Sequence, residues 1–253
     1  MKVKVLSSGS KGNTTYVESN ETRILIDIGN TCKYVTNKLE EIGVDPMSIS
    51  GILISHTHKD HIGGLKVFLK KYNVCVYLTR GMLEELDYVT NYILVDNNEN
   101  FKINNLDIVT VKTSHDAIDS RGFIISDGNS SMVQITDTGY INSSYYEILK
   151  DKNLYIMESN HDIEMLTNGP YPYSLRHRVL SDKGHLSNYD AARYISEFVG
   201  KDTEYVLLAH LSDHNNTPEL AYSELVKRLE HDNKSIDNII VTKQCEDTEM
   251  IEI

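Results

Sequence analysis

The order of hydrophobic and polar residues along this 253-residue chain predicts strands first, then helices, then a second set of strands and helices. Residues 23–28 and 51–55 are nearly continuous apolar runs, which is typical of interior strands covered on both faces. The other expected strands are residues 3–7, 14–18, 106–113, 122–126, 132–136, 154–158 and 205–209.

Helical spacing of apolar residues separates these strands. Apolar residues between Tyr34 and Ile42 fall on one face of a helix that Gly43 ends. Thr217 and Pro218 are a typical N-cap and first position of a helix. The other expected helices lie near residues 65–69 and 188–199, and the last one covers 218–230. The order of elements predicts two sheets packed together with helices outside, an α/β layered sandwich.

Asparagine-rich residues 96–105 lie between apolar segments and are expected to form a solvated loop, not a domain boundary. Chain length and a hydrophobic fraction of 40% allow one large core, so a single domain over residues 1–253 is expected, with two domains as the alternative.

No apolar run approaches the roughly 20 residues of a membrane-spanning helix. The N-terminus turns polar at Ser7 and lacks the apolar core of a signal peptide, so a cytoplasmic location is expected. The three cysteines are far apart, which suggests neither a thiolate zinc site nor a disulfide framework.

The charge balance limits the functions that the chain can have. With 37 acidic and 25 basic residues the net charge is −12, which argues against a passive nucleic-acid-binding module. Bound divalent cations would reverse the field locally, so an anionic substrate stays possible at a metal site.

The segment His56-Thr57-His58-Lys59-Asp60-His61 directly follows the expected strand 51–55. Imidazole and carboxylate ligands suit zinc, manganese or iron. Residues two apart in an extended segment face the same way, so His56 and His58 can share one metal. Asp60 and His61 can face a second metal if the chain then turns, as the following glycines permit. Such a cluster is hard to explain as packing, because buried polar groups are costly without partners.

Two metals need more ligands than this segment holds. His115, Asp137 and His210 each follow an expected strand, which is where open α/β sheets place their ligands. Any one of them alone would be read as an ordinary surface or hydrogen-bonded residue. Together with the six-residue segment they predict one metal centre.

The pattern His56-x-His58-x-Asp60-His61, followed in order by His115, Asp137 and His210, resembles the signature of the metallo-β-lactamase superfamily. The resemblance spans nearly the whole chain and implies a four-layer αββα sandwich with two divalent metal ions at one edge. It implies that one ion is held by His56, His58 and His115, that the other is held by Asp60, His61 and His210, and that Asp137 bridges both.

Four longer segments narrow the resemblance to the YycJ/WalJ/VicX group, which is regarded as DNA exonucleases encoded beside a two-component system for cell-wall control. These segments begin at Ser8, Glu158, Gly184 and Leu208, and the last continues to Ala221. The lactamases themselves carry a cysteine ligand that is missing here, since no cysteine lies near Asp137. The short intervals between ligands leave little room for the extra domains of RNA-processing relatives.

The resemblance implies a binuclear phosphodiesterase in which a metal-bridging hydroxide attacks phosphorus in line. Asp60, His185 and Glu158 are the expected catalytic residues, because 184–187 resembles the motif of tRNase Z that protonates the leaving oxygen and Glu158 orients His185 in the same relatives. A helix-capping or surface role is the alternative for His185.

Substrate contacts are expected from residues around this centre. Arg176 and Arg178 belong to the most basic stretch of the chain and could grip a backbone phosphate, or they could form a solvated helix face. The further candidates are Ser8, Ser10, Asn13 and His161. Tyr171 and Tyr173 could stack a base or could simply pack.

The leading hypothesis is a 5′→3′ DNA exonuclease. A small-molecule hydrolase acting on a thioester, lactone or cyclic phosphodiester is the first alternative, because fold and metals do not set the substrate. A regulatory protein of cell-wall signalling that retains its metals without turnover is the second. The sequence leaves the oligomeric state open.

Overall fold

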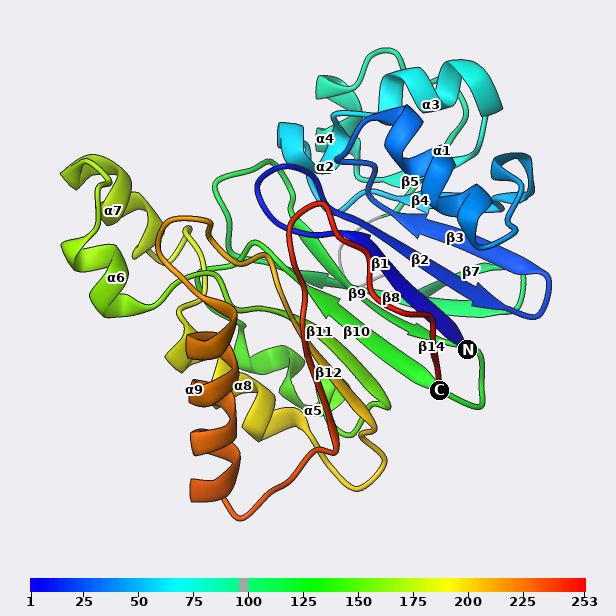
Figure 1. The fold of residues 1–253 in the computed structure, drawn as a ribbon. Coiled ribbons are helices and arrows are strands. Elements are labelled where there is room, and N and C mark those ends of the chain that lie inside the picture. Colours follow the sequence, from blue (N-terminus) through cyan, green and yellow to red (C-terminus); the bar gives the residue numbers. More distant parts are fainter. Residues whose placement is uncertain (96–99) are drawn as a thin grey trace. The chain divides into compact units, whose positions relative to one another are not determined.

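A computed structural model describes residues 1–95 and 100–253, and its backbone contacts divide the chain into two compact units (Figure 1). Unit 1 comprises Met1–Lys112, Ala117–Asn129 and Gln244–Glu252. Unit 2 comprises Thr113–Asp116, Ser130–Lys243 and Ile253. The part of the expected loop at residues 96–99 lies outside the described residues.

The main sheet of unit 1 has the strand order β14-β1-β2-β3-β4-β5-β6. Its first strands pair antiparallel, and from β3 to β6 the neighbours run parallel. The strands are β1 (Lys2–Ser7), β2 (Thr14–Ser19), β3 (Thr22–Ile26), β4 (Gly51–Leu53), β5 (Val76–Leu78), β6 (Tyr92–Leu94) and β14 (Ile251–Glu252). The predicted strands at the start of the chain are confirmed, because their apolar runs are buried as expected.

The prediction of a loop over residues 96–105 is wrong from Asn100 onward. There the chain forms strand β7 (Asn100–Ile103), which pairs antiparallel with β8 (Leu106–Lys112). Strand β8 also pairs with β9 (Arg121–Ser126). The ring of Phe101 stacks on Tyr77 with centroids 5.4 Å apart. This packing and the pairing with β8 outweigh the low strand propensity of the surrounding asparagines.

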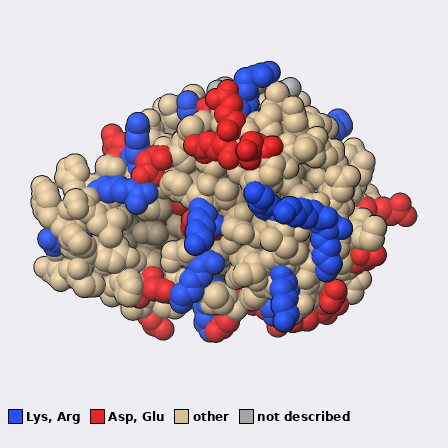
Figure 2. All heavy atoms as spheres, turned by 90° about the horizontal axis from the view of Figure 1, so that it is seen from above, with Lys and Arg blue, Asp and Glu red and all other residues tan. Residues whose placement is uncertain are grey.

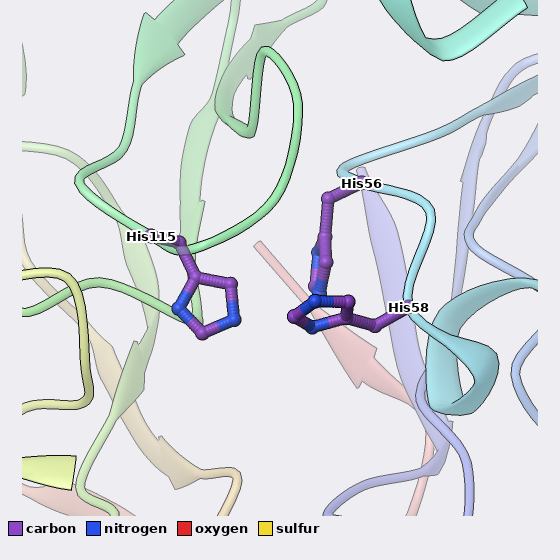
Figure 3. Close-up of side chains that lie close together, drawn as sticks. All are labelled: His56, His58 and His115. Carbon is purple, nitrogen blue, oxygen red and sulfur yellow. The ribbon is translucent and has the colours of Figure 1, made fainter. Parts of the chain in front are cut away.

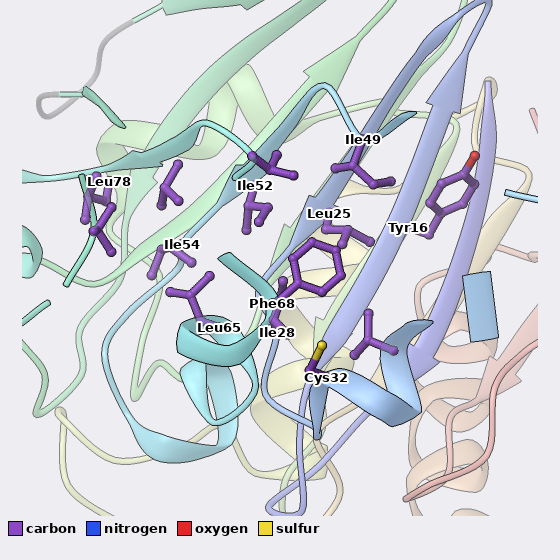
Figure 4. Close-up of a cluster of buried hydrophobic side chains, with 14 of the residues drawn as sticks. Tyr16, Leu25, Ile28, Cys32, Ile49, Ile52, Ile54, Leu65, Phe68 and Leu78 are labelled. Atoms are coloured by element: carbon purple, nitrogen blue, oxygen red, sulfur yellow. The ribbon is translucent and has the colours of Figure 1, made fainter. Parts of the chain in front are cut away.

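Helices α1 (Cys32–Glu41) and α3 (Leu65–Tyr72) cover one face of the unit 1 sheet (Figure 1). Thr31 caps α1 by accepting a hydrogen bond from the backbone of Tyr34. Phe68 of α3 packs among buried side chains of the sheet (Figure 4). The remaining short helices of this unit are a 3₁₀ turn (Pro46–Ser48), α2 (Lys59–Ile62) and α4 (Arg80–Glu85).

Unit 2 is built on the parallel strands β10 (Ser131–Ile135), β11 (Leu154–Glu158), β12 (Tyr205–Ala209) and β13 (Asn238–Val241). Its helices are α5 (Tyr146–Leu149), which follows a 3₁₀ turn (Ser143–Tyr145), α6 (Ile163–Asn168), α7 (Tyr173–Val179), α8 (Asn188–Phe198) and α9 (Pro218–His231). The predicted helices at 188–199 and 218–230 are confirmed, and they lie side by side. Parallel strands end at one edge, so side chains that follow β10, β11 and β12 gather there.

Among the helices of the described residues, none combines the length and the apolar character needed to cross a membrane.

Candidate metal centre

Three histidines and an aspartate follow β4 in unit 1. The rings of His56 and His58 meet edge to face with centroids 4.7 Å apart, and Figure 3 also shows His115 on the loop after β8. The ring of His61 lies 4.0 Å from that of His56. Helix α2 begins after His58 and turns the chain, so that Asp60 Oδ2 lies 3.6 Å from His61 Nε2. The segment therefore forms one side-chain cluster within unit 1.

Asp27 belongs to this candidate site, although the sequence pattern did not single it out. Its side chain is fully buried, and its Oδ2 accepts a hydrogen bond from His61 Nδ1 at 2.8 Å. The backbone and hydroxyl of Ser55 also donate to this carboxylate, at 2.8 and 2.6 Å. A carboxylate that holds the outer nitrogen of a ligand histidine orients the ring and makes it more basic. The available signal was a charged residue that interrupts the apolar run 23–28.

Asn13 lies within the same cluster. Its Nδ2 is 3.0 Å from His61 Nε2 and 3.3 Å from Asp60 Oδ2, while its Oδ1 accepts from the backbone of Gly9 at 2.7 Å. Of the two serines that are also candidates for substrate contact, Ser8 is buried and Ser10 is exposed. Asn13 therefore contacts the candidate ligands, and only Ser10 of the three is open to solvent.

A second cluster lies at the carboxyl edge of the unit 2 strands. Potential ligand atoms of Asp137, Glu158, His185 and His210 lie within 4.8 Å of one another. Glu158 Oε1 is 2.7 Å from His185 Nδ1 and 3.0 Å from His210 Nδ1. Asp137 Oδ1 is 3.5 Å from His210 Nε2 and 3.8 Å from His115 Nε2. The candidate ligands and catalytic residues that belong to unit 2 therefore lie in one cluster: His115, Asp137, Glu158, His185 and His210.

Burial and charge set the protonation of this cluster in opposite directions. Burial would raise the pKa of Glu158, but the charge and hydrogen bonds of His185 and the bond from His210 lower that pKa to about 2. Burial would lower the pKa of His185, but Glu158 raises it above the ordinary value. Burial lowers the pKa of His115. Without a metal, Glu158 is therefore an anion at neutral pH, and His115 is a neutral imidazole.

The hydrogen bonds of the histidines test whether these residues fit a metal. His61 Nδ1 bonds Asp27, His115 Nδ1 lies 3.1 Å from the Gly184 carbonyl, and His210 Nδ1 bonds Glu158. A carbonyl or carboxylate only accepts, so each Nδ1 carries a proton, and Nε2 is the nitrogen that each ring has left for a metal. Buried imidazoles oriented in this way, next to carboxylates, fit zinc, manganese or iron.

Two of the candidate ligands hold unusual backbone conformations. Asp137 has φ of 58° and His210 has φ of 56°, and the buried Asp27 has φ of 62°. This left-handed region costs a residue with a side chain roughly 1–3 kcal/mol, and such residues concentrate at functional sites.

The basic candidates on α7 already have partners within unit 2. Arg178 Nε lies 2.5 Å from Asp116 Oδ2, and this bond raises the pKa of Arg178. Arg176 donates to the carbonyl of Thr167. His161 is 1% exposed, burial lowers its pKa to about 4, and neither ring nitrogen has a hydrogen-bond partner within the described chain.

Comparison with known proteins was made at the level of sequence and of fold. A family model described as "Metallo-beta-lactamase superfamily" matches residues 8–100. The chain is similar to YhfI of Bacillus subtilis, a metallo-β-lactamase fold protein, with a TM-score of 0.76, 20% identity and 98% of each chain covered. The predicted α/β fold of the metallo-β-lactamase type is confirmed.

Two relatives found by sequence share a higher identity with this chain than YhfI does. The chain is 35% identical to exodeoxyribonuclease YycJ of Bacillus anthracis over 89% of this chain and 88% of that protein. It is 34% identical to exodeoxyribonuclease WalJ of Streptococcus pneumoniae over 90% of this chain and 88% of that protein. The predicted class, a metal-dependent hydrolase, is confirmed. The chain belongs to the metallo-β-lactamase superfamily and, within it, to the family of the YycJ and WalJ proteins.

Proposed function

We propose that this hydrolase is a phosphodiesterase that degrades DNA from the 5′ end. The observation that carries the proposal is the pair of a buried Glu158 and a partly exposed His185, 2.7 Å apart beside Asp137. A pair of this kind can deliver a proton to a leaving oxygen, which a phosphodiester needs. The relatives named as exodeoxyribonucleases support DNA as the substrate.

We propose two divalent ions as cofactors. Three histidines would hold one ion, and Asp60 with two histidines would hold the other, while Asp137 would contact both. The first set is His56, His58 and His115, and the second is completed by His61 and His210. When bound, the ions supply an activated water and positive charge that neutralises phosphoryl oxygens. Zinc, manganese and iron all suit these ligands.

His185 is the proposed general acid. Glu158 accepts the hydrogen bond from Nδ1, which fixes the ring and favours the charged imidazolium. The proton on Nε2 would pass to the leaving 3′-oxygen as its bond to phosphorus breaks, and the attacking water would supply the new oxygen of the 5′-phosphate. Glu158 stays ionised throughout and acts by positioning.

Substrate contacts are proposed for Arg176 and Arg178 of α7, and for Ser8, Ser10, Asn13 and His161. Ser10 is exposed and can donate its hydroxyl directly. Arg178 forms an ion pair with Asp116, so a bound phosphate would have to compete with that carboxylate. Figure 2 shows one face on which Lys and Arg side chains stand among neutral residues, with acidic side chains beside several of them.

A small-molecule hydrolase is the second candidate, and the net charge of −12 favours it because a long polyanion would be repelled. The metal chemistry would be the same for a thioester, a lactone or a cyclic phosphodiester. A cytoplasmic location stays a prediction for either candidate.

The decisive experiment offers metal-loaded protein 5′-labelled and 3′-labelled DNA, single-stranded and double-stranded, with RNA and a chromogenic phosphodiester alongside. We expect mononucleotides to be released from the 5′ end of DNA, and we expect Asp137→Ala to abolish this release. Release from the 3′ end would contradict the proposed 5′→3′ direction of cleavage. Hydrolysis of the small phosphodiester without any DNA cleavage would favour the second candidate.

A further inference from the structure

Three buried polar side chains of unit 2, those of Ser159, Asn188 and Asn216, form one hydrogen-bonded group that also bonds the backbone carbonyl of Asn160. We call these four residues the amide network. Asn188 and Asn216 bond each other reciprocally, Nδ2 to Oδ1, at 2.8 Å in both directions. Ser159 Oγ donates to Asn188 Oδ1 at 2.7 Å. Asn216 Nδ2 also lies 2.9 Å from the Ser159 carbonyl and 3.1 Å from the Asn160 carbonyl.

The amide network joins three segments that are far apart in sequence. Ser159 and Asn160 directly follow Glu158, Asn188 begins α8 three residues after His185, and Asn216 precedes α9 six residues after His210. Backbone bonds reinforce the junction, from Asn160 N to the Leu186 carbonyl and from Ser212 N to the Asn160 carbonyl. Each of the three segments therefore carries one residue of the unit 2 cluster (Glu158, His185 or His210) and at least one member of the amide network.

Asn160 makes the contact that reaches a candidate ligand. Its Nδ2 donates to the carbonyl of His210 at 2.9 Å and lies 3.5 Å from His210 Nδ1. His210 holds a left-handed backbone with φ of 56°, a conformation that must be stabilised by its surroundings. The bond from Asn160 fixes the peptide that follows His210, and the ring can then bond Glu158 through Nδ1.

Burial makes the network rigid. Its members range from 1% exposed for Ser159 to 8% for Asn160. A buried amide that loses a partner costs about 1–3 kcal/mol, so alternative arrangements of these loops are disfavoured. A fully bonded polar group in a core can specify one geometry in a way that apolar packing does not.

We propose that Asn160, held by Asn188 and Asn216, is a positioning residue that sets the orientation of His210 toward Glu158 and Asp137. The inference deepens the proposed function and rests on it for the role of His210 as a ligand. The positioning role gives a physical reason for the asparagines in the segments 158–162, 184–188 and 215–221. These asparagines are not themselves candidate ligands.

The test compares Asn160→Ala with Asn153→Ala. Asn153 is a matched control, because its side chain bonds Ser131 N at 2.9 Å and the Asp202 carbonyl at 3.1 Å, at the opposite, amino end of the same strands. Loss of an outer partner of a metal ligand typically lowers metal affinity or activity by about 10–100-fold. We expect Asn160→Ala to lower kcat and zinc or manganese affinity by that order with KM nearly unchanged. Asn153→Ala should lower only the Tm.

Metal affinity is read by competition with a chelating dye, so it is independent of catalysis. If the wild type binds metal but does not cleave DNA, the proposed function fails while the positioning role is still tested. If Asn160→Ala lowers the Tm as Asn153→Ala does and leaves kcat and metal affinity unchanged, the positioning role is overturned.

Asn216→Asp covers the case in which Asn160→Ala does not fold. It keeps the size of the side chain and the oxygen that accepts from Thr217 N, and it removes the donors to the carbonyls of Ser159 and Asn160. We expect the same loss of metal affinity. An unchanged affinity in this folded variant would count against the inference.

Discussion

Asp27 Oδ2 lies 2.8 Å from His61 Nδ1, and neither side chain is exposed to solvent. The carboxylate fixes which nitrogen of His61 carries the proton, and it does so from the end of β3, the strand that pairs with β4 directly before the histidine segment. The orientation of His61 in the unit 1 cluster therefore depends on a buried residue outside the six-residue segment.

Replacing Asp27 should weaken metal binding without abolishing the fold. We expect Asp27→Asn to lower metal affinity by about 10-fold and Asp27→Ala by up to ~100-fold, because the His61 ring loses its anionic partner. Isothermal titration with zinc measures both. Asp45→Asn is the control, since the exposed Asp45 caps a 3₁₀ turn of the same unit. Equal affinities for Asp27→Ala and the wild type would contradict the assigned role.

Replacing His185 should separate proton transfer from metal binding. We expect His185→Ala to lower kcat by about 10²–10⁴-fold, the usual contribution of a general acid. Metal content, measured by atomic emission, should stay at the wild-type level, as should the KM for DNA. Loss of metal in this variant would instead make His185 a ligand and would remove it as the acid.

Replacing Arg178 should reveal whether it contacts a phosphate or only joins α7 to Asp116. We expect Arg178→Ala, in a His185→Ala background that slows cleavage, to weaken DNA binding and to reduce the salt slope of log K by about 1. Fluorescence anisotropy over a range of salt concentrations gives that slope. Arg193→Ala is the control, because Arg193 lies on α8 over the ring of Tyr194. An unchanged slope would leave Arg178 with a purely structural role.

The sequence predicted the parts of the fold that local patterns determine. Buried strands such as β4 and β11 were recognisable from their apolar runs, and α9 from its threonine cap and first-turn proline. The candidate ligands could be found because three histidines and an aspartate within residues 56–61 are hard to explain as packing, and His115, Asp137 and His210 gained their meaning from that segment. The apolar runs, the helix cap and the histidine segment are each local patterns of a few residues.

The parts that could not be predicted depend on contacts between distant segments. Strand β7 forms because β8 pairs with it, despite its asparagine-rich surroundings. Asp27 looked like an interruption of an apolar run, since its partner His61 is 34 residues away. The bond between Asn160 and the His210 carbonyl joins residues 50 positions apart, so the asparagine could be noticed as a motif but not explained.

The segment Gln244–Glu252 returns to unit 1 and provides a test of stability against pH. Asp247 there bonds Lys4 Nζ at 2.7 Å and Lys38 Nζ at 2.9 Å. Burial would raise the pKa of Asp247, but the bonds from both lysines outweigh it and hold the pKa below its usual value. A depressed pKa in the folded state means that the ionised form stabilises the fold above the unfolded pKa of about 3.9.

We therefore expect Asp247→Asn to lower the free energy of unfolding by about 1 kcal/mol at pH 7, the order found for partly exposed ion pairs. The difference from the wild type should vanish as the pH falls below about 3.9 and through the folded pKa, because the wild-type carboxylate is then protonated as well. Urea unfolding at a series of pH values measures this. Asp237→Asn, at an exposed position of unit 2, should show no such difference. A difference for Asp247→Asn that persists unchanged into acid would show that the lysine bonds do not stabilise the fold through charge.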